Sequence, residues 1–248
     1  TQYIYLNPGA KKSVSIPDDF LINYSNPEPV SLYLHIFDPV IDQERRGAFG
    51  NGWLKPGETV RIETEDPEVF SRFSSQRGVL FFNDGDHGDR LVFGGGLFDT
   101  KAITLINISS KVAGYAWSVR NQWAQLPDIE ARHGKMEPVF LGPGMGQDYT
   151  FQIDVPTSIG ISVECSAGEV KSELMKEVED GPAKYKLITR GLVINQKLEP
   201  GNYALSVSMD HPNNASNKID DPGGPPSVIQ PFFVLEAPET LKTFGREE

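Results

Sequence analysis

The sequence predicts an all-β protein made of two β-sandwich units of the jelly-roll or immunoglobulin-like type. The first observation is that short apolar stretches with period-two alternation recur roughly every 8 to 12 residues, separated by turns rich in proline and glycine. The second is that a Pro-Gly turn followed by an alternating strand occurs twice, over residues 54–63 and 198–208. A chain of 248 residues can form one large β domain or two small ones.

Both Pro-Gly stretches predict strands with one buried face. In the second stretch, Tyr203, Leu205 and Val207 alternate with small or polar residues. In the first, Val60 and Ile62 take the corresponding positions. Because successive side chains of a strand point to opposite faces, the alternation places these apolar residues against a core.

Further landmarks repeat in the same order along the chain. Residues 6–9 and 141–144 share the pattern Leu-x-Pro-Gly, and residues 13–17 and 152–156 share an alternating strand that stops at proline. Together with the two Pro-Gly strands, this order favours a structural duplication.

We place the first sandwich at residues 1–120 and the second at residues 138–248. The intervening stretch, 121–137, is polar and has no strand alternation, so we interpret it as a linker. A linker of 17 residues is compatible with rigid packing and with mobile packing of the two units.

In the first unit, the glycine-rich polar stretch 38–53 is predicted as a loop. Residues 79–82 and 91–93 flank an acidic turn, so they are predicted as a hairpin. Alternation predicts the other strands of this unit at residues 3–6, 13–16, 20–24, 30–37, 102–107 and 114–119.

In the second unit, alternation predicts strands at 152–155 and 159–165, before the strand that follows Gly201. The charged segment 169–186 is predicted as a short helix or a solvated hairpin. The apolar run 229–235 closes the unit. Because Pro231 has no N–H to donate to a neighbouring strand, we expect this strand at a sheet edge.

Charge and hydropathy exclude several classes of partner. The formal net charge is −11, and Lys and Arg form no concentrated patch, so nucleic acid is not expected as a ligand. The longest apolar stretches have the length of strands, and none approaches the roughly 20 residues of a transmembrane helix. The single cysteine, Cys165, allows no intramolecular disulfide, and its place in an alternating strand predicts a buried thiol.

An acidic turn carries the predicted metal site. Asp84, Asp86 and Asp89 alternate with glycine and His87, which gives a tight loop the hard oxygen ligands that calcium prefers. The other interpretation is a solvated hairpin turn without a metal. Residues 210–221 form a second oxygen-rich loop with the same two interpretations. Calcium is the only cofactor that the sequence suggests.

Aromatic residues near predicted loops are the candidate ligand-binding residues. Trp53, Trp123 and Tyr115 could form a stacking platform for sugar rings, or a patch at a membrane interface. Trp117 lies within a predicted strand, and we expect it in the core. The sequons at Asn23, Asn107 and Asn214 would accept glycans only in a eukaryotic secretory setting.

Residues 147–209 resemble the bacterial pre-peptidase C-terminal type of β-sandwich. The resemblance rests on the opening strand 149–155, the branched strand 159–163 and the element Leu-x-x-Gly-x-Tyr at residues 198–203. The chain departs from the family pattern at residues 172–175, where Ser-Glu-Leu-Met replaces an Asp-rich strand. The resemblance implies a non-catalytic accessory or binding domain of a secreted protein.

These observations favour a non-enzymatic binding protein that recognises a carbohydrate or a protein surface through loops at the sandwich ends. One alternative is a membrane-acting or toxin-like β protein, whose exposed tryptophans would engage lipid. Another is a hydrolase with dispersed catalytic residues, among which Asp84, Asp86 and His87 would be the first suspects. The scattered histidines and the lack of a nucleophile motif favour the non-enzymatic role.

Overall fold

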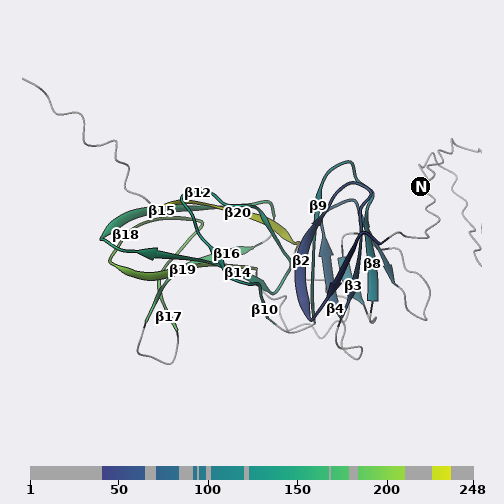
Figure 1. Ribbon diagram of the computed structural model, residues 1–248, viewed down its shortest axis with the longest axis horizontal. Coiled ribbons are helices and arrows are strands. Elements are labelled where there is room, and N and C mark those ends of the chain that lie inside the picture. The colour runs from purple at the N-terminus through teal and green to yellow at the C-terminus, as the bar shows by residue number, and fades with distance from the viewer. Residues whose placement is uncertain are drawn as a thin grey trace, which may run out of the picture. The chain divides into compact units, whose positions relative to one another are not determined.

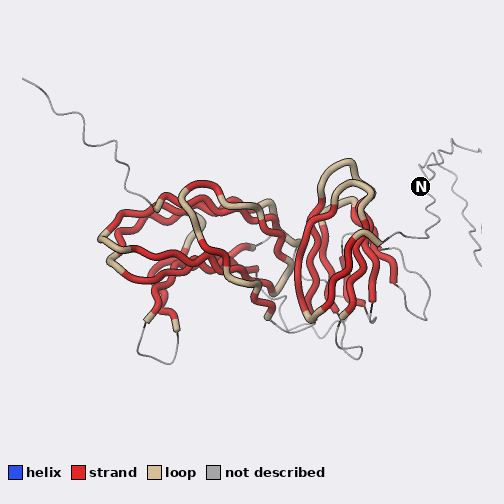
Figure 2. Tube along the Cα trace, viewed as in Figure 1, coloured by secondary structure: helices blue, strands red, loops and turns tan. Residues whose placement is uncertain are grey.

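The computed structural model describes residues 41–64, 71–83, 92–93, 95–98, 102–119, 123–167, 169–178, 184–209 and 225–235. These residues form strands and turns and contain no helix, as Figures 1 and 2 show, which confirms the all-β prediction. None of them belongs to a helix that could span a membrane. The strands predicted before residue 41 lie outside the described residues.

The first pair of sheets is formed by β1 to β9 around one hydrophobic core. One sheet has the order β1-β3-β8-β5-β6 and the other β2-β9-β4-β7. Inward side chains from both sheets, including Val60, Ile62 and Trp117, fill the core. The strands are β1 (Gln43–Arg46), β2 (Phe49–Leu54), β3 (Thr59–Glu63), β4 (Ser71–Ser75), β5 (Val79–Asn83), β6 (Val92–Phe93), β7 (Gly95–Phe98), β8 (Ala102–Asn107) and β9 (Ala113–Val119).

The second pair of sheets is formed by β10 to β20 around a larger core. One sheet has the order β10-β14-β19-β16-β17, with β11 also paired to β14. The other has the order β12-β20-β15-β18, with β13 also paired to β20. The strands are β10 (Ala124–Gln125), β11 (Ile129–Glu130), β12 (Gly134–Lys135), β13 (Val139–Leu141), β14 (Met145–Ile153), β15 (Thr157–Cys165), β16 (Val170–Glu177), β17 (Tyr185–Arg190), β18 (Val193–Leu198), β19 (Gly201–Met209) and β20 (Ser227–Val234).

The two pairs of sheets share one strand order. In one sheet of each pair, the order β3-β8-β5-β6 corresponds to β14-β19-β16-β17. In the other sheet, the order β2-β9-β4-β7 corresponds to β13-β20-β15-β18. Two packed sheets of antiparallel strands that alternate between the sheets are typical of a jelly roll. A duplication requires such a shared order, although the structural duplication itself stays a prediction.

The strand order matches different Leu-x-Pro-Gly turns from those that the sequence pattern pairs. Leu54 to Gly57 precedes β3, and its counterpart is Leu141 to Gly144 before β14, not the turn before β19. The two turns have the same backbone geometry, with φ of 79° at Gly57 and 76° at Gly144. The Gly57 N–H donates to the carbonyl of Asn107, the last residue of β8, at 2.7 Å, and the Gly144 N–H donates to the carbonyl of Met209, the last residue of β19, at 3.2 Å.

The predicted loop 38–53 is wrong from residue 43 onward, where the chain forms β1 and β2. The glycines that indicated a loop serve another purpose in β2. A side chain at position 50 would place its Cβ 2.3 Å from the Trp117 ring. A side chain at position 52 would place its Cβ 2.6 Å from the Tyr115 hydroxyl. The two rings are stacked, so β2 carries glycine because aromatic rings from β9 cover it.

The expected edge position of the closing strand is also wrong. β20 pairs with β15 on one side and with β12 and β13 on the other. Pro231 faces the break between β12 and β13, where its carbonyl accepts a hydrogen bond from the Met136 N–H at 2.9 Å. A proline fits this central strand because the break requires no N–H from it.

Two other stretches can be compared with their predictions. Residues 123–135, part of the proposed linker, contain β10, β11 and β12, which pair with β14 and β20. The charged segment after residue 169 forms β16 and β17, which pair as antiparallel strands, so the hairpin interpretation is confirmed over the helix.

Cys165 is exposed, so the prediction of a buried thiol is wrong. It lies at the end of β15, where the alternating burial of that strand stops.

Candidate functional site

The outer face of the β20-β15-β18 layer carries the candidate site. Along β15, Ile159, Ile161 and Val163 point into the core and are buried. The alternate positions, Ser158, Gly160 and Ser162, therefore face outward. All three are small, so the central strand of this layer forms a low floor between two flanking strands.

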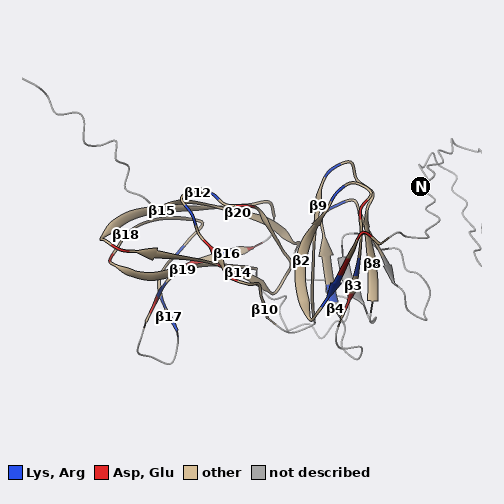
Figure 3. Cartoon of the chain, viewed as in Figure 1, with Lys and Arg blue, Asp and Glu red and all other residues tan. Residues whose placement is uncertain are grey.

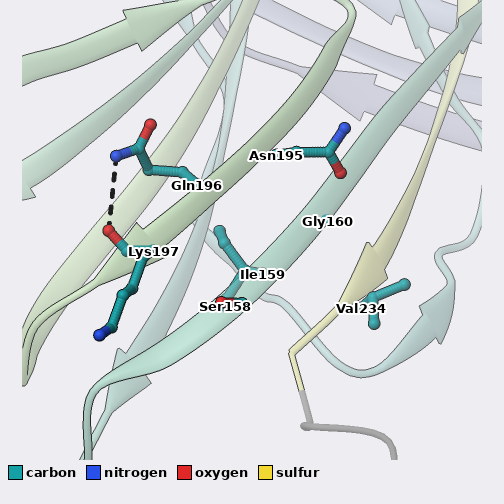
Figure 4. A pocket seen from close by; sticks show the side chains of 7 residues that line it. All are labelled: Ser158, Ile159, Gly160, Asn195, Gln196, Lys197 and Val234. Carbon is teal, nitrogen blue, oxygen red and sulfur yellow. Dashed lines mark hydrogen bonds between the residues drawn. The ribbon is translucent and has the colours of Figure 1, made fainter.

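The strand register places larger side chains on both sides of this floor. Ser162 lies between Val193 of β18 and Phe232 of β20, and Gly160 lies between Asn195 and Val234. The resulting outer-face groove has a volume of about 480 Å³ at its Gly160 end. Figure 4 shows this end, with the amide of Asn195 close to Gly160 and the side chain of Lys197 extending outward.

Gly160 determines the depth of the outer-face groove. A Cβ at this position would lie 3.4 Å from Asn195 Oδ1 and 3.6 Å from Val234 Cβ. Both distances are compatible with ordinary contacts, and Gly160 is not among the glycines with positive φ. The backbone therefore does not require glycine here, and its effect is to leave the space open.

The side chains around the groove are mostly neutral. Ser158 provides a hydroxyl and Asn195 an amide. Gln196 pairs with core-facing Ile159 and alternates with Asn195, so its side chain does not share the outer face, and its amide donates to the Lys197 carbonyl at 3.4 Å. Figure 3 shows that charges are sparse on β15, β18 and β20, whose only charged residues are Glu164 and Lys197. Glu164 forms an exposed ion pair with Lys135 at 3.5 Å.

Two exposed apolar side chains lie on the same face. Val193 is 71% exposed and Phe232 is 41% exposed, on opposite sides of Ser162. An accessible aromatic ring beside amide and hydroxyl groups can stack on an apolar ligand surface while its neighbours make hydrogen bonds.

The predicted aromatic ligand residues do not form a common site. Tyr115 is fully buried in the first core, where its hydroxyl accepts from Arg45 Nε at 3.5 Å. Trp53 is partly buried and packs edge-on against Phe140, with 6.3 Å between ring centroids. Trp123 is 51% exposed, and its indole N–H donates to Gln125 Oε1 at 3.2 Å.

The predicted calcium ligands Asp84, Asp86 and Asp89 lie outside the described residues, as do His87 and the whole loop 210–221. The hairpin that leads to them is confirmed, since β5 pairs with β6 as antiparallel strands. Among the side chains that can be described, no group of three His, Cys, Asp or Glu residues could hold a metal ion.

One carboxylate outside the groove has a shifted titration. Burial raises the pKa of Asp148 on β14, while hydrogen bonds from Ser206 and Gln125 and the charge of Lys184 act in the opposite direction. Asp128 raises the pKa further by charge repulsion. Partial desolvation of the carboxylate is enough to explain the raised pKa, so the shift does not indicate a catalytic role for Asp148.

Sequence reasoning missed the outer-face groove because its residues are individually ordinary. The available signal was the composition of the outward positions of residues 157–165. A strand that is flanked on both sides and carries small residues at three successive outward positions leaves a depression in the sheet surface. Recognising it requires the pairing of β15 with β18 and β20, which the pattern alone does not provide.

Comparisons with known proteins leave the family open. No family model and no curated protein matches the chain. Similar solved structures include the CUB1-EGF-CUB2 domains of rat MASP-1, at 8% identity and a TM-score of 0.21, covering 76% of this chain and 99% of that one. The turret protein A223 of Sulfolobus turreted icosahedral virus has 12% identity and a TM-score of 0.20, with coverages of 75% and 96%. YhaK from Escherichia coli has 13% identity and a TM-score of 0.24, with coverages of 80% and 90%. Such low TM-scores carry no inference about function.

Proposed function

We propose that the protein is a non-enzymatic carbohydrate-binding protein whose ligand lies in the outer-face groove of β15, β18 and β20. The observation that carries the proposal is the row of small residues Ser158, Gly160 and Ser162, bordered by the Asn195 amide and by the exposed ring of Phe232. The site lies on a sheet face, in contrast to the end loops expected from the sequence.

The chemistry of the groove supports a neutral ligand rich in hydroxyl groups. The Asn195 amide presents a donor and an acceptor together, which suits adjacent sugar hydroxyls. The ring of Phe232 suits the apolar face of a pyranose. A net charge of −11 disfavours polyanionic glycans, since these would be repelled by the molecule as a whole.

The shape supports an extended ligand over a single compact one. The groove is open rather than enclosed and follows strands that run across the sheet surface. A polysaccharide chain can lie in such a depression and make weak contacts with several sugar units.

Electrophoresis of the native chain through gels that contain soluble mannan, xyloglucan, laminarin or dextran tests the proposal. We expect at least one neutral polysaccharide to retard the protein. Gly160→Thr should abolish the retardation by filling the floor, and Phe232→Ala and Asn195→Ala should weaken binding at least tenfold.

Val155→Thr is the matched control, because Val155 is 66% exposed in the turn between β14 and β15 and is not among the residues that line the groove. Its retardation should equal that of the unmodified chain. Unchanged migration in all four gels, or full retardation of Gly160→Thr, would contradict the proposed function.

A further inference from the structure

Trp123 lies on the outer face of the sheet that contains β10, β14 and β19. Met145 and Tyr149 of β14 belong to the second core, so the alternate positions Gly146 and Asp148 face outward. A Cβ on Gly146 would lie 2.7 Å from Trp123 Cζ2, which places the indole over this glycine. The ring is therefore on a different sheet from the outer-face groove, and Trp123 does not line that groove.

One edge of the indole is anchored to the sheet. Trp123 Nε1 donates to Gln125 Oε1 at 3.2 Å, and the neighbouring ring atoms Cε2 and Cζ2 are the ones closest to Gly146. Gln125 is itself held in place, because β10 pairs with β14 through Gln125 and Gly146. These contacts involve a single edge and 51% of the residue is exposed, so part of the ring face is open to solvent. An anchored ring loses little conformational freedom when a ligand stacks on it.

Small and acidic residues surround the ring. Ser208 lies opposite Gly146 in the β14–β19 ladder, and Ser206 lies opposite Asp148. Both serines are partly exposed, so the sheet beside the ring is low. We call the surface formed by Trp123, Gly146, Asp148, Ser206 and Ser208 the tryptophan platform.

Two carboxylates give the tryptophan platform a negative charge. Asp148 is hydrogen-bonded to Gln125, the residue that holds the indole, and Asp128 is close enough to repel the Asp148 carboxylate. Neither aspartate forms a salt bridge with another described residue. Lys184 attracts Asp148 but is itself paired with Glu177 at 3.6 Å, so it offsets the negative charge only in part.

This combination favours an organic cation as the ligand, and a guanidinium in particular. The face of an indole and a nearby carboxylate both attract positive charge. A guanidinium is planar, so it stacks on one ring while its N–H groups bond to oxygens beside that ring. A quaternary ammonium is bound by cages of several aromatic rings, whereas Trp123 contacts no other ring among the described residues. A neutral sugar would gain nothing from the two carboxylates.

We propose that the tryptophan platform binds an arginine side chain of a partner protein. The guanidinium stacks on Trp123, and its positive charge relieves the repulsion between Asp148 and Asp128. An open surface admits a side chain that another protein presents, and the net charge of −11 attracts a basic partner from a distance. The inference is independent of the proposed function, since the platform shares no residue with the outer-face groove.

NMR titration of the intact chain with three peptides tests the proposal. The peptides are acetyl-Gly-Arg-Gly-amide and its counterparts with citrulline or lysine in place of arginine. We expect the arginine peptide to shift the amide signals of Gln125 and Gly146. Citrulline has nearly the same shape without the charge and should bind at least tenfold more weakly. Lysine should also bind more weakly, because an ammonium is strongly hydrated and not planar. Equal affinity for arginine and citrulline, or no binding of the arginine peptide, would overturn the proposal.

Variants of the tryptophan platform locate the binding. Trp123→Leu should weaken the arginine peptide at least tenfold and leave the melting temperature unchanged, because the ring lies on the surface. Asp148→Asn should weaken it about threefold, the effect of one exposed charge. Glu130→Gln is the matched control, since it removes the same charge on β11, opposite Thr150, and should leave the affinity unchanged. Equal affinity of Trp123→Leu and the unmodified chain would contradict the assignment.

Gly160→Thr and Trp123→Leu separate the two sites. Gly160→Thr should leave the binding of the arginine peptide intact, and Trp123→Leu should leave the retardation by polysaccharide intact. Loss of that retardation in Trp123→Leu would make sugar the ligand of the platform and overturn the inference. Binding of the arginine peptide by a chain that no polysaccharide retards would overturn the proposed function and support the platform.

Discussion

At the residue scale, Asn107 shows how one side chain can close a loop. Its Nδ2 donates to the carbonyls of Leu54 at 2.8 Å and Lys111 at 2.7 Å. Its Oδ1 accepts from the Ser109 N–H at 2.9 Å and from the Ser109 hydroxyl at 2.7 Å. The residue is fully buried, so the triplet Asn107-Ile108-Ser109 forms a structural turn and its amide is inaccessible to a glycosyl donor in the folded chain.

Replacement of Asn107 by Ala should therefore destabilise the fold. We expect the free energy of unfolding to fall by about 2 to 3 kcal/mol, because several buried partners lose their hydrogen bonds. Denaturant unfolding monitored by circular dichroism measures the change, with Asn195→Ala on the exposed outer face as the control. Equal stability of the two variants would contradict this role of Asn107.

Tyr149 is the opposite case, a buried side chain that costs stability. Its ring packs against Phe233, while its hydroxyl has no hydrogen-bond partner among the described residues. We expect Tyr149→Phe to raise the free energy of unfolding by about 1 kcal/mol, since a desolvated hydroxyl is removed and the ring stays. A lower stability of the variant would mean that the hydroxyl has a partner.

Tyr149 also predicts a dependence on pH. Burial raises the pKa of Tyr149, so the folded state keeps its proton after the unfolded state, with a pKa of about 10, has lost it. Because the unfolded state then binds fewer protons, stability should fall as the pH rises above about 10. Thermal unfolding between pH 8 and pH 11 measures this decline, which should be smaller in Tyr149→Phe.

At the element scale, two strand glycines predict opposite effects of the same substitution. Gly52→Ala should cost about 1 to 3 kcal/mol, because its Cβ would collide with the Tyr115 ring. Gly160→Ala should instead stabilise the protein by about 0.5 to 1 kcal/mol, since its Cβ would make only ordinary van der Waals contacts and glycine is unfavourable in strands. Chemical denaturation of the two variants side by side checks the pair, and changes of the same sign would contradict the described environments.

The turn before β3 supplies a test of backbone conformation alone. Gly57 has a φ of 79°, and nothing lies within 4 Å of a Cβ built on it. Gly57→Ala should therefore cost about 1 to 2 kcal/mol through the left-handed backbone, whereas Gly57→Asn should cost less, because asparagine tolerates this region. Equal stabilities of both variants and the parent would show that the turn adopts another conformation.

Alternation predicted the strands well where side chains determine burial. Tyr203, Leu205 and Val207 are buried along β19, as the pattern of that stretch indicates. The pattern failed in β2 and β20, where glycine and proline indicated a loop and an edge. Both residues depend on neighbours far along the chain, an aromatic pair in β9 and the break after β12, which local composition does not reveal.

At the scale of the whole molecule, Phe140 of the second core contacts residues of β2 and β9. It is buried, contacts the Trp53 ring edge-on, and lies where a Cβ on Gly114 would be 2.6 Å from its ring. Its carbonyl also accepts from Asn51 Nδ2 at 2.9 Å. We expect Phe140→Ala to cost about 3 to 5 kcal/mol and to separate the unfolding of the two cores.

Fluorescence offers the measurement in a Trp53→Phe, Trp123→Phe background, because Trp117 of the first core is then the single tryptophan. In the parent chain, its transition should coincide with the loss of circular dichroism that reports all strands. In Phe140→Ala the two transitions should differ, while Val112→Ala, an exposed change, should leave them coincident. Coincident transitions in Phe140→Ala would contradict the coupling.

Composition and turn rhythm were enough to predict an all-β fold with paired sheets. They could not locate the candidate site, because the outer-face groove exists only once β15 is set between β18 and β20.

The shared strand order also exposes the chain to a particular folding error. During folding, β13 could enter the place of β2, since both precede the same Leu-x-Pro-Gly turn. Aligning the two turns puts Val139 at the position of Gly52, where even a Cβ would lie 2.6 Å from the Tyr115 hydroxyl. Because only a strand with glycine at this position fits beside Tyr115, β13 cannot replace β2 within the chain. The same requirement prevents β13 of a neighbouring molecule from replacing β2 at high concentration.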